Sequence, residues 1–289
     1  MANSIDNFNC ASFEPTRKTV WHLQKMKDEG KKITMVGTAF FNPFVTMWCE
    51  HAGVDLVRYI APGENGRQRA ERIESWTRYQ RSMAPNICLN AVMESCLFSD
   101  KYKALDNASM LITDGADSVM PMGVTNDTLK YLADNQVAVF GHVGCLSGWQ
   151  TARIGGYKRV GKTAEDAMKI FRQAYEYQEN GMVGMTIEMT SREVTDAIAK
   201  HLRVPVIGVA AGGAADGSEL VVLDLLGMLP EQAMAKHSKM YCDLMGTSLK
   251  AFKDFDADVK NTTYPAEQHG WGMDQRELEK FMNELEQKY

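Results

Sequence analysis

Residues 182–211, MVGMTIEMTSREVTDAIAKHLRVPVIGVAA, indicate most clearly how the chain folds. This segment opens with an apolar run that ends near Glu188, continues with an amphipathic stretch at Ser191–His201, and closes with a second apolar run from Val204. Short runs rich in Val and Ile predict strands, and apolar residues that recur every three or four positions predict a helix. A strand, a helix and a second strand in this order predict a parallel pair of strands.

The same alternation recurs from about residue 33 onward. The predicted strands are Ile33–Phe40, Leu56–Ala61, Asn86–Val92, Ser118–Met122, Val137–Gly144, Met182–Met189, Val204–Ala211 and Leu220–Leu225. The clearest predicted helices are Trp76–Met83, Lys101–Asp114, Asn126–Asn135, Thr163–Asn180 and Ser191–His201. Eight strands in a chain of this length favour a closed (β/α)₈ TIM barrel, of the α/β class, over an open sheet. Periodicity alone does not show closure, so the open sheet stays an alternative.

Three parts of the chain can be distinguished. We expect a single (β/α)₈-barrel domain over residues 1–289, with an N-terminal helical extension at 1–30 and extra C-terminal helices at 230–289. The C-terminal segment is charged and ends in a predicted helix at Arg276–Tyr289. It could cover the barrel or reach a neighbouring subunit.

Composition excludes several function classes. The chain has 289 residues, 45% of them hydrophobic and 24% charged, with a net charge of −5, which is typical of a globular protein. It has no basic block that predicts a nucleic-acid partner, no apolar run as long as the ~18 residues of a membrane span, and no signal-peptide pattern. The six cysteines include no C-x-x-C pair, which predicts free thiols and a cytoplasmic location.

Two polar residues stand at the ends of predicted strands, where TIM barrels carry their working residues. His142 lies between two glycines in FGHVG, and Glu188 closes TIE. A carboxylate is costly to bury unpaired, so Glu188 should face the mouth of the barrel or meet a partner. It could then exchange a proton with a ligand. The competing interpretations are a core histidine and a salt-bridged glutamate at the rim.

Two glycine-rich loops follow the fifth and seventh predicted strands. Arg153–Lys162 combines glycines with cations, and Gly212–Gly217 continues VAAGG. Backbone N–H groups in such loops can hold a carboxylate or phosphate, although turn formation also explains the glycines.

Together these motifs resemble ketopantoate hydroxymethyltransferase, a family of the phosphoenolpyruvate mutase and isocitrate lyase superfamily. The similar segments are KKITMVGTAF (31–40), EHAGVDLV (50–57), VAVFGHVG (137–144), GGYKRVGKT (155–163), IEMTSREVTDAIAKHLRVPVIGVAAGG (187–213) and DG (216–217). The resemblance covers about residues 30–230 and is specific in its combination of motifs.

The resemblance implies an aldol-type transfer. In the family, a divalent metal binds a 2-oxo acid, a carboxylate removes the proton next to the ketone, and the enolate attacks a one-carbon unit from methylenetetrahydrofolate. Glu188 matches the catalytic glutamate of the family, and His142 matches a histidine at the edge of its site. The resemblance also implies a homo-oligomer.

The chain departs from the family at the residues that hold the metal and the substrate. Ala61 and Asn90 replace two metal-binding acids, and on the fourth strand Met120 and Met122 replace a substrate-binding lysine and a metal-binding glutamate. Hard divalent cations need several oxygen ligands, usually with carboxylates among them. We therefore predict no tightly bound Mg²⁺ at this position. A relocated metal would have to use Glu64 or Glu94.

These replacements predict a less polar pocket. Met120 and Met122 have the same parity on their strand and should face one side, and with Ala61 they would make a roomier, more apolar mouth. Asn90 is a further predicted substrate-binding residue. Tyr59 shares the parity of Ala61 and is expected to reach the cavity, with Arg58 pointing outward. Arg153 or Lys158 could replace the lost lysine as the partner of a substrate carboxylate.

Three functions are compatible with the sequence. The first is a divergent hydroxymethyltransferase-like enzyme that acts on a small carbonyl or carboxylate compound through Glu188 and His142 without the metal. The second is a genuine metal-dependent 3-methyl-2-oxobutanoate hydroxymethyltransferase that uses methylenetetrahydrofolate. The third is a non-catalytic barrel that binds a ligand.

Overall fold

The computed structural model describes residues 17–38, 42–146, 151–153, 155–230, 233 and 235–289. Residues 1–16 of the predicted N-terminal extension and residues 39–40 of the first predicted strand lie outside the described residues. The chain forms two compact units, the first being Met1–Leu225 with Met234–Lys239 and the second Leu226–Ala233 with Met240–Tyr289.

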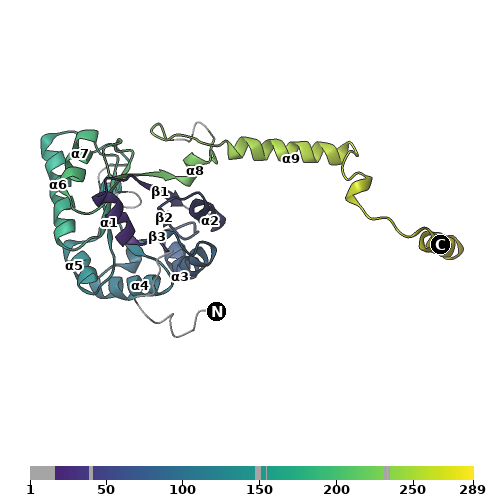
Figure 1. The fold of residues 1–289 in the computed structure, drawn as a ribbon, viewed down its shortest axis with the longest axis horizontal. Coiled ribbons are helices and arrows are strands. Elements are labelled where there is room, and N and C mark those ends of the chain that lie inside the picture. Colours follow the sequence, from purple (N-terminus) through teal and green to yellow (C-terminus); the bar gives the residue numbers. More distant parts are fainter. Residues whose placement is uncertain (1–16, 39–41, 147–150, 154, 231–232, 234) are drawn as a thin grey trace. The chain divides into compact units, whose positions relative to one another are not determined.

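The first unit is a (β/α)₈ barrel (Figure 1). Its strands are β1 Ile33–Thr38, β2 Leu56–Tyr59, β3 Cys88–Met93, β4 Ser118–Pro121, β5 Phe140–Gly144, β6 Gly184–Glu188, β7 Val206–Val209 and β8 Gly217–Val221. All pairs are parallel, in the order β4-β3-β2-β1-β8-β7-β6-β5. A parallel bridge between Val119 of β4 and Val139, the residue before β5, links the two ends of the sheet, so the barrel is nearly closed. The predicted fold is confirmed.

Helices form the outer layer of this unit, with α4, α5, α6 and α7 on the outside of the strands in Figure 1. The helices are α1 Val20–Asp28, α2 Phe44–His51, α3 Gly66–Met83, η3 Ser95–Leu97, α4 Lys101–Thr113, α5 Asn126–Asp134, α6 Ala164–Glu179, α7 Arg192–His201 and α8 Val222–Leu225. α1 lies in the predicted N-terminal extension, and its Leu23 joins the core of the barrel.

The barrel interior is filled by side chains of alternate strand residues, because successive side chains of a strand point to opposite faces. Leu23 packs there with apolar side chains from most of the strands, namely Ile33, Met35, Leu56, Cys88, Met120, Phe140 and Ile207. Gly184 leaves room for the Phe140 ring, which a Cβ at this position would strike. This apolar layer closes the barrel below the ends of the strands, where polar side chains begin.

Several strands are shorter than predicted, and two elements differ more. The eighth strand was predicted at Leu220–Leu225, but β8 begins at Gly217 and Val222–Leu225 forms α8. Its apolar run continues from strand into helix, so periodicity cannot divide it. The third helix was predicted from Trp76, but α3 begins at Gly66, where the Asn65 side chain accepts a hydrogen bond from the backbone N–H of Gln68.

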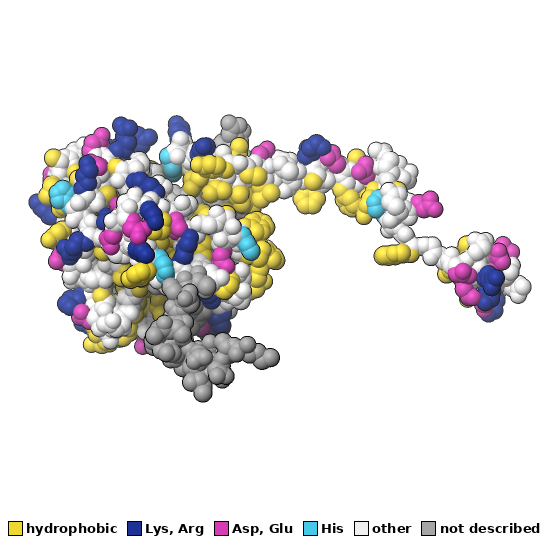
Figure 2. Space-filling view, viewed as in Figure 1, with side chains coloured by type: hydrophobic (Ala, Val, Ile, Leu, Met, Phe, Trp, Pro, Cys, Tyr) yellow, Lys and Arg dark blue, Asp and Glu magenta, His cyan; other side chains and the backbone are white. Residues whose placement is uncertain are grey.

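The second unit contains α9 Leu244–Lys260, η6 Glu267–His269 and α10 Gln275–Lys288, which are the predicted extra C-terminal helices. None of the residues in these three helices is buried. Figure 2 shows apolar side chains on the surface of α9. Within the described part of the chain, no helix has both the length and the apolar composition that crossing a membrane requires.

Candidate active site

A cavity of 270 Å³ lies at the carboxyl ends of the barrel strands. All eight strands contribute to its wall, which is the usual position of a TIM-barrel active site. The lining residues are Gly37, Arg58, Tyr59, Ile60, Val92, Met120, Met122, His142, Tyr157, Glu188, Val209, Glu219 and Val221. The wall is therefore mostly apolar, and its acidic and basic side chains, Arg58, His142, Glu188 and Glu219, come together in two pairs.

The first pair of ionisable side chains is His142 with Glu188. His142 Nε2 lies 3.0 Å from Glu188 Oε2, and the two side chains are 3% and 10% exposed. They come from β5 and β6, which run side by side with Gly144 opposite Glu188. Gly144 has φ +90°, and a Cβ there would strike the Glu188 carbonyl oxygen, so a glycine is needed for this close approach.

Several buried polar atoms around this pair lack hydrogen-bond partners. Within the described chain, neither ring nitrogen of His142 makes a hydrogen bond, because the short contact to Glu188 is not aligned as one. The Thr186 hydroxyl, two residues before Glu188 on β6, is also buried without a hydrogen-bond partner among the described residues. Buried polar groups are almost always hydrogen-bonded in folded proteins, so these atoms point to a ligand or water in the cavity.

The second pair is Arg58 with Glu219. Arg58 Nη1 lies 2.9 Å from Glu219 Oε2, and both side chains are 7% exposed. Arg58 Nε donates to Asn90 Oδ1 at 2.8 Å, and the Asn90 amide donates to the Ser118 hydroxyl at 2.8 Å. The guanidinium is thus held from β8 on one side and from β3 on the other.

Gly37 makes the pairing of Arg58 with Glu219 possible. β1 lies between β2 and β8 in the sheet, so the ion pair passes over β1. A Cβ at Gly37 would lie 2.6 Å from Glu219 Oε1, closer than any side chain allows. The missing side chain gives the Glu219 carboxylate its place beside the guanidinium.

Burial and charge act against each other in this pair. Burial raises the pKa of Glu219, while the charges of Arg58 and His142 lower it. Burial likewise lowers the pKa of Arg58, while Glu219 and Glu188 raise it. A buried ion pair is kept only where such partners offset the cost of leaving water. Arg58, Glu219, Glu188 and His142 therefore form one electrostatic cluster.

Most of the site residues predicted from the sequence reach this cavity. Glu188, His142, Met120, Met122 and Tyr59 line it. Asn90 is buried at its edge through the hydrogen bond to Arg58. Ala61 is buried but does not line the cavity. Lys158 is exposed and does not line it either, although its neighbour Tyr157 does.

The predicted outward orientation of Arg58 is wrong, whereas Tyr59 contributes to the cavity lining as predicted but turns its hydroxyl away. The Tyr59 hydroxyl donates to the Thr77 hydroxyl of α3 at 2.8 Å, which places this side chain against the outer helix. Arg58 points inward, to Asn90 and Glu219. The prediction counted parity from Ala61, but β2 ends at Tyr59, and alternation is not maintained past the end of a strand.

Sequence reasoning also missed Glu219. It stands in a stretch that was predicted to precede the eighth strand, because the apolar run LVVLDLL drew the prediction toward later residues. The available signal was an acid and an arginine within otherwise apolar strands, since charged residues are rarely buried unless they are paired.

At the positions that the resemblance implies for the family's metal, the residues present do not fit a hard divalent cation. Ala61 and Met122 supply no oxygen ligand, and Asn90 Oδ1 already accepts a hydrogen bond from Arg58. Of the two acids considered for a relocated metal, Glu94 pairs with Arg69 at 2.5 Å and Glu64 is exposed. Among the described residues, no three His, Cys, Asp or Glu side chains group closely enough to hold a metal.

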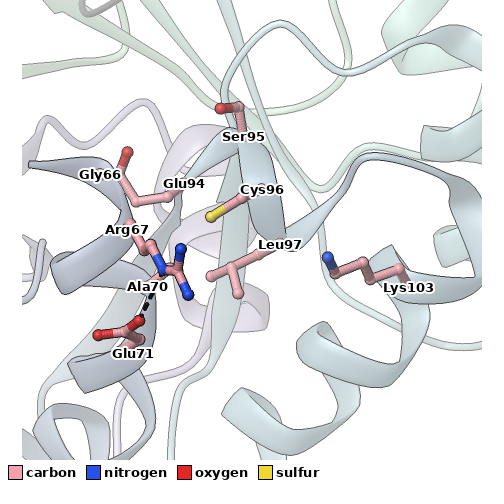
Figure 3. A pocket seen from close by; sticks show the side chains of 9 residues that line it. All are labelled: Gly66, Arg67, Ala70, Glu71, Glu94, Ser95, Cys96, Leu97 and Lys103. Atoms are coloured by element: carbon pink, nitrogen blue, oxygen red, sulfur yellow. Dashed lines mark hydrogen bonds and ion pairs between the residues drawn. The ribbon is translucent and has the colours of Figure 1, made fainter.

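A second cavity, of 490 Å³, lies between α3, η3 and α4 (Figure 3). Its charges are largely matched, because Arg67 pairs with Glu71 at 3.1 Å and Glu94 pairs with Arg69. Figure 3 shows Lys103 across the cavity from Arg67. Both carboxylates in its lining, Glu71 and Glu94, are thus engaged by arginines, so the barrel mouth is the better candidate for catalysis.

Comparison with solved structures supports the fold. The crystal structure of 2,3-dimethylmalate lyase, a member of the PEP mutase/isocitrate lyase superfamily, superposes with a TM-score of 0.54 at 10% identity, covering 89% of this chain and 90% of that chain. Oxaloacetate acetylhydrolase superposes with a TM-score of 0.52 at 7% identity, covering 84% and 87%. At these identities the likeness concerns the fold alone.

Comparison with sequences is more specific. The chain is 31% identical to 3-methyl-2-oxobutanoate hydroxymethyltransferase 1 of Methylibium petroleiphilum, over 97% of this chain and 98% of the relative. It is 30% identical to the 3-methyl-2-oxobutanoate hydroxymethyltransferase of Nitrosopumilus maritimus, over 93% and 99%. The family model described as ketopantoate hydroxymethyltransferase matches residues 65–267. The chain therefore belongs to the ketopantoate hydroxymethyltransferase family.

Proposed function

We propose that this protein is a divergent ketopantoate hydroxymethyltransferase-like enzyme that acts on a small carbonyl or carboxylate compound without the Mg²⁺ of its family. The observation that carries the proposal is the Glu188 carboxylate, which lies 3.0 Å from His142 in a cavity lined by all eight strands. Membership of the family supports carbon–carbon bond chemistry on a small substrate.

Glu188 is the proposed base. It takes the proton from the carbon next to a ketone, and the electron pair of the broken C–H bond moves to the ketone oxygen to give an enolate. The enolate carbon then attacks a one-carbon unit at the oxidation level of formaldehyde, the electron pair of its C=O π bond moves to the oxygen, and that oxygen takes up the proton held by Glu188. Where methylenetetrahydrofolate is the donor, water releases this unit from the donor nitrogens. His142, beside Glu188, would hold the carboxylate in place and exchange its proton.

The substrate pocket is proposed to be partly apolar. Met120, Met122 and Val209 form part of its wall, which suits a short aliphatic side chain. Asn90 and Tyr59 would shape the side of β2 and β3. Ala61 and Lys158, which do not line the cavity, would contribute through backbone position or on closure over a ligand.

Cofactor, partners and location follow from the same proposal. No tightly bound metal is proposed, and methylenetetrahydrofolate is the one-carbon donor only where the family reaction is retained. The proposed partner is a small molecule and not nucleic acid or a membrane. We further propose a homo-oligomer in the cytoplasm.

A genuine metal-dependent 3-methyl-2-oxobutanoate hydroxymethyltransferase is the second candidate. Its support is the 31% identity to such a protein over nearly the full length of both chains. It predicts turnover of 2-oxoisovalerate that depends on Mg²⁺ and methylenetetrahydrofolate. The departures at Ala61, Asn90 and Met122 argue against it.

Exchange of the proton next to the ketone tests the proposed base. We expect the protein to exchange this proton of 2-oxoisovalerate, or of another short 2-oxo acid, in D₂O, as followed by proton NMR. Glu188→Gln should lower the exchange rate at least about 100-fold, because removing a general base typically costs 10²–10⁴-fold. Glu193→Gln, at an exposed position of α7, is the matched control and should leave the rate unchanged.

Two results would contradict this assignment. Exchange that survives in Glu188→Gln would mean that another residue is the base. An absence of exchange with every short 2-oxo acid, together with binding of such an acid, would favour the non-catalytic barrel.

A further inference from the structure

We infer that the Arg58 guanidinium, held between Glu219 and Asn90, is the fixed cation that binds the anionic oxygens of the substrate in place of a metal ion. This inference rests on the proposed function for its substrate class, a short 2-oxo acid. It adds the group that recognises the anion and predicts how that group is positioned.

The position of Arg58 is the first argument. Arg58 is 6% exposed and lines the same cavity as Glu188 and His142. Its guanidinium lies next to Asn90 and donates from Nε to Asn90 Oδ1 at 2.8 Å. The resemblance implies that Asn90, Ala61 and Met122 stand at the family's metal positions, and of these three only Asn90 has a suitable oxygen. The Arg58 guanidinium therefore places a positive charge beside a set of side chains that cannot hold a metal ion.

The rigidity of Arg58 is the second argument. Glu219 holds Nη1 at 2.9 Å, Asn90 accepts from Nε, and the Cζ atom lies 5.7 Å from the centre of the Phe140 ring. Contacts from β8, β3 and β5 thus fix a residue of β2. Groups that are held before the ligand arrives stabilise developing charge best, because they need not reorganise during the reaction.

The chemistry of the guanidinium is the third argument. It is planar and matches the two oxygens of a carboxylate, or the carboxylate and enolate oxygens of a 2-oxo acid, with paired N–H donors. Lysine would offer a point charge without this geometry. Arg58 is thus suited to the anionic end of the substrate, while the apolar wall with Met120 receives the aliphatic end.

Charge balance explains why Glu219 is needed beside Arg58. In the free protein Glu219 offsets the charge of Arg58, which makes burial of the cation tolerable. A bound anion adds a negative charge to a cluster that also contains Glu188 and His142. Burial already raises the pKa of Glu219, so this carboxyl is the group placed to take up a proton and leave Arg58 to the ligand.

Binding of oxalate, a planar dianion that resembles an enolate, tests the inference without turnover. The full-length protein is treated with EDTA and titrated with oxalate by calorimetry, and the titration is repeated with Mg²⁺ added. We expect binding in EDTA that Mg²⁺ does not strengthen. Arg58→Lys should weaken it at least about tenfold, which is the size expected for loss of a paired charge-assisted contact.

A double variant separates binding from folding. Arg58→Met alone would leave Glu219 as an unpaired buried charge, so Arg58→Met/Glu219→Gln removes both charges together. We expect this variant to keep its circular dichroism spectrum and to bind oxalate at least about tenfold more weakly. Arg203→Met/Glu179→Gln, which removes an exposed pair of the same kind, is the control and should bind as the unmodified protein does.

The inference is overturned by oxalate binding that requires Mg²⁺, by an unchanged affinity in a folded Arg58→Met/Glu219→Gln variant, or by no binding to the unmodified protein. The proposed function is judged separately by proton exchange. Oxalate binding through Arg58 without exchange would leave the anion site standing and remove the enolising base. Exchange that depends on Glu188 but not on Arg58 would support the enolising base and rule out Arg58 as the anion site.

Discussion

Four ionisable side chains and one glycine carry the account at the residue scale. Glu188 and His142 lie 3.0 Å apart at one side of the cavity, and Arg58 and Glu219 lie 2.9 Å apart within the same lining. Each carboxylate thus has a basic or cationic partner. We accordingly propose that Glu188 transfers the proton and that Glu219 holds the Arg58 cation.

The packing of Gly37 against Glu219 gives a prediction on stability. Gly37→Ala places a methyl group 2.6 Å from Glu219 Oε1, and the carboxylate must shift away from Arg58 to avoid it. Overpacking of this kind costs about 1–3 kcal/mol, so the free energy of unfolding in urea should fall by that amount. Gly213→Ala is the control, since a Cβ there meets nothing within 4 Å. Equal stability of the two variants would show that Glu219 is free to move.

Sequence reasoning at this scale reached Glu188 and His142, because both stand at the ends of well-marked strands. It also reached Met120 and Met122. It failed for Arg58 and Glu219, since their pairing across β1 is a tertiary contact between residues far apart in the chain. The local pattern marks each of them as a charged residue in an apolar strand, but it does not encode which residue it contacts.

At the scale of elements, the amino ends of the strands are tied together by charged side chains. Asp117, just before β4, accepts hydrogen bonds from Arg17 at 2.9 Å, from Arg81 of α3 at 2.6 Å and from the backbone N–H of Leu89 in β3 at 2.8 Å. One carboxylate thereby joins two strands, a helix and the segment before α1. This end of the barrel contributes stability, while the opposite end carries the cavity.

Removal of the Asp117 charge should destabilise the barrel. Asp117→Asn leaves the Arg81 and Arg17 side chains without their shared carboxylate, and breaking a buried ion pair on one side costs about 3 kcal/mol or more. The free energy of unfolding in urea measures the loss. Asp134→Asn breaks an exposed pair with Lys130 and should change stability by about 0.5 kcal/mol or less. An equally small change in the free energy of unfolding for Asp117→Asn would show that Asp117 does not hold these elements together.

The order of the elements was predictable because each buried parallel strand leaves an apolar run and each outer helix leaves an amphipathic one. The predicted boundaries were wrong where the local composition obscured the hydrophobic periodicity. The first turns of α3, GRQRAERIE, carry so much charge that only its later half showed the helical pattern. At β8 the apolar run extended into α8.

At the scale of the whole molecule, the second unit leaves apolar side chains in solvent. Leu249, Phe252, Phe255 and Val259 of α9 are between 44% and 71% exposed and recur along one side of the helix. Trp271 is 100% exposed. Large exposed apolar patches are typical of protein interfaces. They support the proposed homo-oligomer, which the sequence could imply only through its family.

Charged substitutions on this side of α9 should therefore reduce the assembly. We expect the protein to elute with a mass that is a multiple of 32.3 kDa in light scattering after size exclusion. Phe252→Lys with Phe255→Lys should lower that mass, because charges at a hydrophobic interface lose their hydration when it closes. Lys253→Gln, on the same helix, should not. A monomer in the unmodified protein would refute the proposed oligomer.

The central claim is that enolisation in this barrel depends on Glu188 and on no divalent metal. The most direct measurement is proton exchange of 2-oxoisovalerate in D₂O by protein treated with EDTA, compared with the same protein given Mg²⁺, Mn²⁺, Co²⁺ or Zn²⁺. We expect the protein to exchange this proton in EDTA at a rate that added metal does not raise. Exchange that appears only with metal, accompanied by tight metal binding in calorimetry, would contradict it.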